Sequence, residues 1–169
     1  MIRPEIGEDY NAIFEVNKLA FEQENEAQLV EKIRQSANFN PQLSLVADNK
    51  GSIVGHILFS DLIIQSHKGN FSALALAPLA VHPKYQNQGI GSQLVQQGLR
   101  KCQSLGHKVV VVIGHPTFYT RFGFSSATDR GLSVIWQVPD EAFLILELVP
   151  DALDGISGVV KYPSVFDAV

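Results

Sequence analysis

The sequence predicts an α/β fold: a central mixed sheet of about six or seven strands with about four helices, in the order β-α-α-β-β-β-α-β-α-β-β. Three observations predict it. Apolar residues recur at helical spacing in the ranges 8–21, 25–35 and 88–105. Runs rich in β-branched and apolar residues fill the ranges 43–47, 52–64, 71–81 and 108–113. The helix at 88–105 stands between two such runs, which implies a right-handed crossover between parallel strands.

The N-terminal part predicts a short edge strand, Arg3–Ile6, followed by two helices, Glu8–Phe21 and Asn25–Gln35. The apolar side of the first helix is formed by four residues: Ile13, Val16, Leu19 and Ala20. Four glutamates stand in and around the two helices: Glu22, Glu24, Glu26 and Glu31. They form either a solvated face or an acidic mouth that attracts a cationic amine.

Three strands follow and form an antiparallel meander. Leu43–Ala47 and Ser52–Ile64 are joined by Asp48–Gly51, which has hairpin chemistry. The third strand, Phe71–Val81, is apolar at almost every position, which favours burial on both faces. Pro78 lies inside it and lacks an N–H. Either the strand has a bulge there that leaves backbone donors free, or the strand ends early.

The segment after this strand predicts a binding site for an anion. A helix that begins near Gln88–Gly91 and runs to Leu105 follows the strand directly, and Gly106 is a candidate C-terminal cap. The N-terminus of a helix has unpaired N–H groups and a partial positive charge, so it attracts phosphate. Gly89 and Gly91 permit a close backbone approach. The alternative is a tight strand-to-helix turn that binds nothing.

Two common phosphate-binding motifs do not fit this turn. A Walker loop needs a Lys and a spacing that the segment lacks, and Leu94 stands where a dinucleotide fingerprint needs its third Gly. What remains is Gln-x-x-Gly-x-Gly, formed by Gln86, Gly89 and Gly91 and preceded by Val81-x-Pro83. In these residues the chain resembles the GNAT superfamily of acyl-CoA-dependent N-acetyltransferases, whose pyrophosphate loop has this pattern.

A second segment carries the same resemblance. After the strand 108–113, the run from His115 to Phe124 is similar to a short GNAT helix that carries a tyrosine, with Tyr119, Gly123 and Phe124 at the family's spacing. His115 departs from the pattern, since many members have Asn near this position. Further strands are expected at 142–149 and 158–162. The chain's ending is similar to that of a bacterial subgroup of predicted acetyltransferases.

The resemblance implies an acetyl-CoA site and a set of residues that form it. In the family, the strand before the loop holds the thioester carbonyl and the pantetheine amides, and the loop holds the diphosphate. The residues expected to bind the cofactor are Leu79, Ala80, Val81, Gln86, Asn87, Gln88, Gly89, Ile90, Gly91 and Ser92.

Tyr119 is the expected catalytic residue, because a phenol is protonated at neutral pH and can donate to a departing thiolate. Its alternative role is an aromatic core residue between Phe118 and Phe122. The base that deprotonates the amine is open. Glu24, Glu26 and His82 are candidates, each also explained by a place on the surface.

Composition bounds the class of protein. A chain of 169 residues favours one domain, 1–169, and 46% hydrophobic with 18% charged residues suits a soluble globular core. The net charge of −4 and the lack of a Lys/Arg run argue against nucleic acid as a partner. No apolar run is long enough to cross a membrane, and the N-terminus has no signal-peptide core, so a cytoplasmic protein is expected.

The positions of the cysteine and the histidines bear on whether the chain has a reactive thiol or a metal site. Cys102 is the only cysteine and lies on the apolar side of its helix, which predicts a buried structural thiol. The five histidines lack metal-ligand spacing, so no metal site is expected.

Together these observations predict an N-acetyltransferase that moves an acetyl group from acetyl-CoA to a primary amine by direct transfer in a ternary complex. Two alternatives stay open. A non-catalytic acyl-CoA-binding module or sensor would share the site, and a nucleotide-binding domain would use the same helix mouth but need an acidic residue after the next strand, where 114–116 has none. The acceptor is a small-molecule or peptide amine, and a homodimer through the C-terminal strands is compatible with the sequence.

Overall fold

The computed structural model describes residues 1–168, and its residues fall into two compact units. The first consists of residues 1–60, 76–101 and the C-terminal segment from 164, and the second of residues 61–75 and 102–163. Two long strands, β3 (Ser52–Ser66) and β4 (Gly69–Val81), run through both. The prediction of a single domain stays a prediction.

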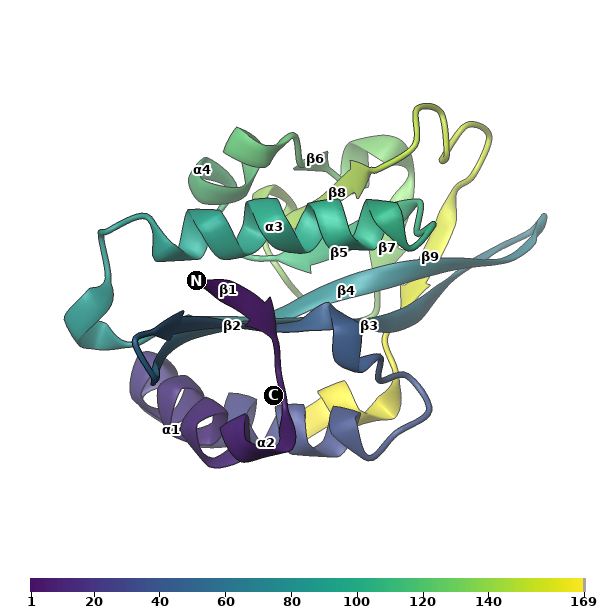
Figure 1. The fold of residues 1–169 in the computed structure, drawn as a ribbon. Helices are drawn as coiled ribbons and strands as arrows, with labels where there is room; N and C mark the ends of the chain where they lie inside the picture. Colours follow the sequence, from purple (N-terminus) through teal and green to yellow (C-terminus); the bar gives the residue numbers. More distant parts are fainter. Residues whose placement is uncertain (169) are drawn as a thin grey trace. The chain divides into compact units, whose positions relative to one another are not determined.

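In the first unit, three antiparallel strands are covered by helices on both faces (Figure 1). The strand β1 (Ile2–Pro4) pairs with β2 (Ser44–Asn49), and β2 pairs with the first half of β3. The helices α1 (Tyr10–Phe21) and α2 (Asn25–Arg34) lie on one face, and α3 (Ile90–Ser104) lies on the other (Figure 1). This matches the predicted elements to within two or three residues.

Alternating side chains on β3 explain this two-sided cover. An added Cβ on Gly98 of α3 would lie 2.4 Å from the ring of Phe59, and one on Gly55 would lie 2.9 Å from Leu94. The two glycines therefore let α3 approach the strands closely. The other face of β3 carries His56 and Leu58, which are fully buried, and His56 contacts Asn17 of α1.

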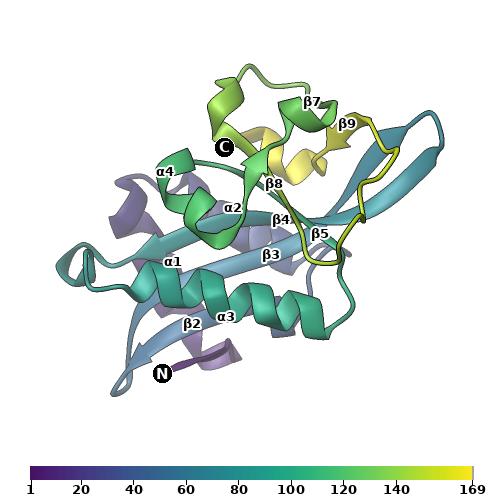
Figure 2. The same ribbon diagram turned by 90° about the horizontal axis from the view of Figure 1, so that it is seen from above.

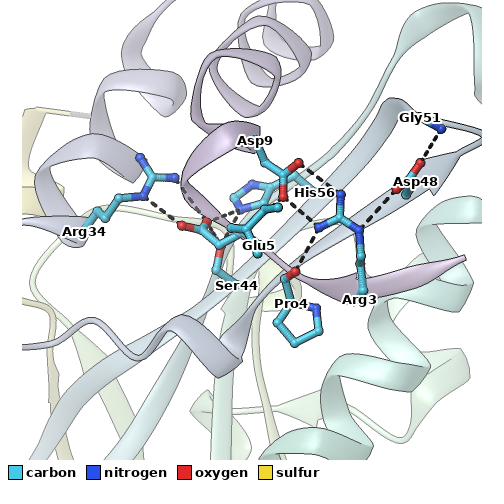
Figure 3. Close-up of polar contacts among 10 residues, drawn as sticks. Arg3, Pro4, Glu5, Asp9, Arg34, Ser44, Asp48, Gly51 and His56 are labelled. Atoms are coloured by element: carbon cyan, nitrogen blue, oxygen red, sulfur yellow. Dashed lines mark hydrogen bonds and ion pairs between the residues drawn. The ribbon is translucent and has the colours of Figure 1, made fainter.

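The buried side of α1 and α2 also carries a connected polar network (Figure 3). The carboxylate of Glu5 accepts two hydrogen bonds from Arg34, at 2.9 and 3.1 Å, and a further one from the hydroxyl of Ser44. The Nε2 of His56 lies 2.9 Å from the Ser44 hydroxyl, and its Nδ1 lies 3.2 Å from the amide nitrogen of Asn17. The network therefore ties α1 and α2 to all three strands.

The protons in this network have one consistent arrangement. The amide nitrogen of Asn17 also donates to the carbonyl of Ile13, which identifies it as the nitrogen. It therefore donates to Nδ1 of His56, whose Nε2–H donates to Ser44, whose hydroxyl donates to Glu5. Burial, with a smaller contribution from the charge of Arg34, lowers the pKa of His56 to about 3. His56 is thus a neutral core histidine.

The second unit contains the parallel strand pair that the sequence predicts. The first half of β4 pairs in parallel with β5 (Val109–Ile113), with Leu74 opposite Val110. The strand β8 (Phe143–Glu147) is antiparallel to β5, and β6 (Ser125–Ser126) pairs with β8. The strand β9 (Gly158–Lys161) runs beside the outer half of β3 (Figure 2) and is paired in parallel with β7 (Leu132–Val134).

The hydrogen-bonded order of the strands is β1-β2-β3-β4-β5-β8-β6, with β9 beside β3 and β7 beside β9. Within residues 1–168 the sheet has nine strands rather than the predicted six or seven. The two strands that the sequence did not reveal are β6 and β7, which have only two and three residues. Such short strands have no readable alternation of polar and apolar residues.

Other details correct or confirm the predictions. The strand β4 continues to Val81, so Pro78, which follows a cis peptide bond, does not end it. Leu19 was expected on the apolar side of α1 but is 43% exposed, and α3 ends before Leu105. Cys102 is fully buried as predicted, and burial raises the pKa of its thiol to about 12.

Candidate functional site

The ten residues predicted to bind the cofactor lie in one part of the first unit, from the end of β4 to the first turn of α3. Ala80 is buried, while Leu79 and Val81 are half-buried. The loop residues 86–89 are exposed. The predicted bulge that would free backbone donors near Pro78 stays a prediction.

The loop turns sharply into α3 by means of two left-handed residues. Asn87 has a φ of 64° and Gly89 a φ of 84°, conformations that Asn tolerates and Gly adopts without strain. The N–H of Gln93 donates to the carbonyl of Gly89 at 3.0 Å, so Gly89 closes the first turn of α3. Nothing lies within 4 Å of a Cβ built on Gly89. Glycine is therefore favoured at this position by its φ and not by a lack of space.

The start of α3 offers backbone donors to an anion. Among residues 1–168, no hydrogen bond is found from the backbone N–H of Gly89, Ile90 or Gly91. These donors lie at the N-terminal end of α3, a helix of 15 residues, and this end carries the partial positive charge of the helix dipole. This arrangement suits a phosphate or diphosphate group.

Side chains of the loop hold its backbone in place. The amide nitrogen of Gln86 donates to the carbonyl of Val81 at 3.1 Å. Nδ1 of His82 accepts a hydrogen bond from the backbone N–H of Lys84 at 3.1 Å, and the N–H of Tyr85 donates to the carbonyl of His82 at 2.8 Å. The path from strand to helix is therefore set by bonds within the loop.

The bond to His82 bears on its candidacy as a base. In a neutral imidazole, one nitrogen accepts and the other carries the proton. Since Nδ1 accepts from Lys84, Nε2 carries the proton, and neither nitrogen has a free lone pair. The geometry thus argues against His82 as the base for the amine.

Tyr119 belongs to the second unit, at the end of the short helix α4 (Pro116–Tyr119). It is 8% exposed, and its ring packs edge-on against Phe118 and Phe124, with centroids 4.9 and 5.6 Å away. A Cβ on Gly114 would lie 2.6 Å from the ring, so this glycine leaves room for Tyr119. The structure thus confirms the expected short helix, and the rings that pack against Tyr119 are Phe118, as expected, and Phe124.

The hydroxyl of Tyr119 is a protonated donor. Burial raises its pKa above the ordinary value near 10. Across residues 1–168, no hydrogen bond is found that engages this hydroxyl. The hydroxyl is therefore protonated at neutral pH, and it donates its proton to no residue of the described chain.

Two of the acidic residues around α1 and α2 form an ion pair or hydrogen bonds with neighbouring side chains. Glu24 lies 3.3 Å from Lys18, and both are about half exposed, at 47% and 46%. Glu26 accepts hydrogen bonds from Gln23. These contacts are typical of a solvated face, and the acidic mouth stays a prediction.

Two searches of the described residues gave negative results. In residues 1–168, no group of three or more His, Cys, Asp or Glu side chains is arranged to hold a metal ion. Over the same range, none of the helices has the length and apolar character needed to span a membrane.

Comparisons with known proteins decide the family. The sequence profile described as "Acetyltransferase (GNAT) domain" matches residues 1–127. The chain belongs to the GNAT acetyltransferase family. This confirms the resemblance in the loop 86–91 and around Tyr119, and with it the predicted fold class.

Two uncharacterised N-acetyltransferases of Escherichia coli K12 are similar to the chain. YhbS is 36% identical over 168 residues, which cover 99% of this chain and 98% of YhbS. YjhQ is 37% identical over 134 residues, which cover 79% of this chain and 74% of YjhQ.

Two solved GNAT structures are similar in fold. The crystal structure of YhbS in complex with CoA has a TM-score of 0.92 and covers 99% of this chain and 91% of its own. A GNAT acetyltransferase from Brucella melitensis, crystallised with acetyl-CoA, is 30% identical, with a TM-score of 0.81 and coverage of 99% and 97%.

Sequence reasoning missed two residues that shape these GNAT segments. The sequence offers His82 as a candidate base or a surface residue, whereas its Nδ1 caps the turn before the loop. Asn or Asp directly before a turn is a known signal for such a cap, whereas histidine is not. The sequence assigns no role to Gly114, because its place beside the ring of Tyr119 depends on tertiary packing.

Proposed function

We propose that this GNAT protein is an acetyl-CoA-dependent N-acetyltransferase that acts on a primary amine by direct transfer in a ternary complex. The observation that carries the proposal is the set of unbonded N–H groups at the start of α3, next to the loop with the Gln-x-x-Gly-x-Gly pattern. The structures of YhbS with CoA and of the Brucella protein with acetyl-CoA support the choice of donor.

The residues present fit coenzyme A. Gly89, Ile90 and Gly91 offer backbone donors to its diphosphate, and the exposed loop leaves them accessible. The end of β4, at Leu79–Val81, would hold the amides of the pantetheine arm. Bound acetyl-CoA would supply the thioester, whose carbonyl carbon is the atom that the amine attacks.

Transfer of the acetyl group needs a proton for the sulfur. The amine nitrogen forms a C–N bond as the C–S bond breaks, the nitrogen loses a proton and the thiolate gains one. We assign the second proton transfer to Tyr119, whose hydroxyl is protonated and without a hydrogen bond in the described residues. The group that accepts the proton of the amine is unassigned.

The proposal is tested by calorimetry and by an acceptor screen. Titration with acetyl-CoA is expected to show binding, and a screen of small amines, polyamines and peptides is expected to release free thiol with at least one acceptor. Absence of binding at millimolar acetyl-CoA would overturn the proposal. Binding without transfer to any amine would instead favour a non-catalytic acyl-CoA sensor.

Tyr119→Phe tests the assigned proton donor. We expect kcat to fall by about 10²- to 10⁴-fold, the usual contribution of a general acid, while the Kd for acetyl-CoA changes little. Tyr162→Phe is the matched control, because Tyr162 is another tyrosine whose pKa burial raises. Equal turnover of wild type and Tyr119→Phe would remove Tyr119 from the mechanism.

The remaining expectations form part of the same proposal. A small-molecule or peptide amine is the acceptor, and the net charge of −4 supports the absence of nucleic acid and membrane partners and a cytoplasmic location. A homodimer through the C-terminal strands is supported by Ile135, which follows β7 and is 71% exposed. Light scattering on the purified protein tests the dimer.

A further inference from the structure

His82 controls the shape of the segment that leads from β4 to the diphosphate loop. Its backbone N–H donates to the carbonyl of Val54 on β3 at 2.8 Å, which fixes the end of the strand. Its Nδ1 then accepts from the N–H of Lys84, and its carbonyl accepts from the N–H of Tyr85. One residue therefore makes three bonds at the point where the chain leaves the sheet.

The bond to Nδ1 exists only while this nitrogen is unprotonated. A protonated imidazole carries hydrogen on both nitrogens and has no acceptor for the Lys84 N–H. The groups in contact with His82 do not compensate. The ring of Tyr85 lies edge-on at 5.7 Å, the Val54 carbonyl of β3 accepts from the backbone N–H of His82, and no ion pair joins His82 to a carboxylate in residues 1–168.

We propose that His82 is a positioning residue for coenzyme A: in its neutral Nδ1-acceptor form it holds the turn that presents the backbone donors of residues 89–91, and protonation releases this turn. The inference rests on the proposed cofactor site. It assigns His82 a role in binding, distinct from the role of a catalytic base.

The pair of variants His82→Ala and His82→Asn tests the role of Nδ1 of His82 as a hydrogen-bond acceptor. The oxygen of Asn can replace Nδ1 in the same type of turn, but it does not titrate. At pH 8 we expect His82→Ala to weaken CoA binding about three- to ten-fold, the effect of losing one hydrogen bond, and His82→Asn to stay within about two-fold of wild type. His67→Ala, on the exposed tip of the β3–β4 hairpin, is the control and should bind as wild type does.

The pH dependence separates positioning from simple structural loss. Over the pH range in which its own ¹H–¹⁵N signals show His82 to gain a proton, CoA affinity of the wild type should fall about three- to ten-fold relative to that of His82→Asn. This ratio cancels the titration of the phosphates on CoA. An unchanged ratio, or tighter binding of the protonated wild type because of attraction to the diphosphate, would overturn the inference.

A spectroscopic measurement on the wild type does not depend on whether the variants fold. Long-range ¹H–¹⁵N spectra distinguish the two neutral tautomers of histidine, and the account requires the Nε2–H form at His82. The Nδ1–H form would contradict it. Failure of wild-type protein to bind CoA at pH 8 would instead count against the proposed function.

Discussion

Two polar regions of the first unit differ in how their donors and acceptors are used. In the network around Glu5, buried side chains bond to one another, and only the amide oxygen of Asn17 lacks a partner among its buried polar atoms. At the start of α3, the backbone N–H groups of Gly89, Ile90 and Gly91, residues that are exposed or half-buried, lack partners within the described chain. The first arrangement stabilises the fold, and the second leaves donors for a ligand.

The contrast yields a general expectation. Changes in the buried network should alter the free energy of unfolding and leave CoA affinity of the folded protein unchanged. Changes in the loop should alter CoA affinity with little effect on stability. Variants at three buried positions test the effect on the free energy of unfolding, from the largest expected loss to the smallest.

Glu5→Gln should have the largest effect on stability. It removes the charge that accepts both bonds from Arg34, whose side chain is only 12% exposed, and leaves that cation buried without its counter-ion. We expect unfolding in urea to show a loss of about 3–5 kcal/mol. Glu24→Gln, in the exposed pair with Lys18, is the control and should cost at most about 1 kcal/mol. A similar loss for both variants would contradict the assignment.

Gly98→Ala should have a smaller effect, through packing. The added methyl group would lie 2.4 Å from the ring of Phe59, which is fully buried. Overpacking of this kind costs about 1–3 kcal/mol, which a shift in the urea midpoint measures. Gly7→Ala is the control, because nothing lies within 4 Å of its added Cβ and its φ is not left-handed. Equal midpoints for the two variants would show that α3 adapts freely.

Acid should weaken the network through His56. Its pKa is lowered from about 6.5 to about 3, so below pH 6.5 the unfolded chain binds a proton that the folded chain does not. Stability is therefore full above pH 6.5 and falls as the pH drops, by at most about 1.4 kcal/mol per pH unit from this group. Unfolding in urea between pH 7 and pH 4.5 measures the slope.

The matched variants for this slope are His56→Gln and His67→Gln. The first removes the buried histidine and should flatten the dependence in this range, whereas the second removes an exposed one and should not. The carboxylates of Asp9 and Glu147, whose pKa values are lowered by their partners, begin to contribute near their ordinary values of 3.8 and 4.5, but they do so equally in wild type and in both variants, so the difference in slope isolates His56. The same slope in wild type and His56→Gln would contradict the account.

The sequence predicted the long elements and the loop because their signals are local. The glycines of Gln-x-x-Gly-x-Gly act through backbone conformation, and the apolar spacing of α3 is a property of one segment. The parallel pair of β4 and β5 followed from the order strand, helix, strand.

The sequence could not predict features that depend on distant partners. The network around His56 joins Glu5, which directly follows β1, to residues of four elements, and no pattern in the chain marks Glu5 as the partner of Arg34. The bond of His82 to Lys84 is local, but histidine in this role has no strong sequence preference to read. The short strands β6 and β7 form only because longer strands lie beside them.

The central claim is that the backbone donors at the start of α3 bind the diphosphate of coenzyme A. Titration of ¹⁵N-labelled protein with CoA tests it most directly, with pantetheine, which lacks the diphosphate, as the control. The account predicts that the amide signals of Gly89, Ile90 and Gly91 move with CoA and stay in place with pantetheine. Binding of CoA that leaves these three amides unmoved would contradict it.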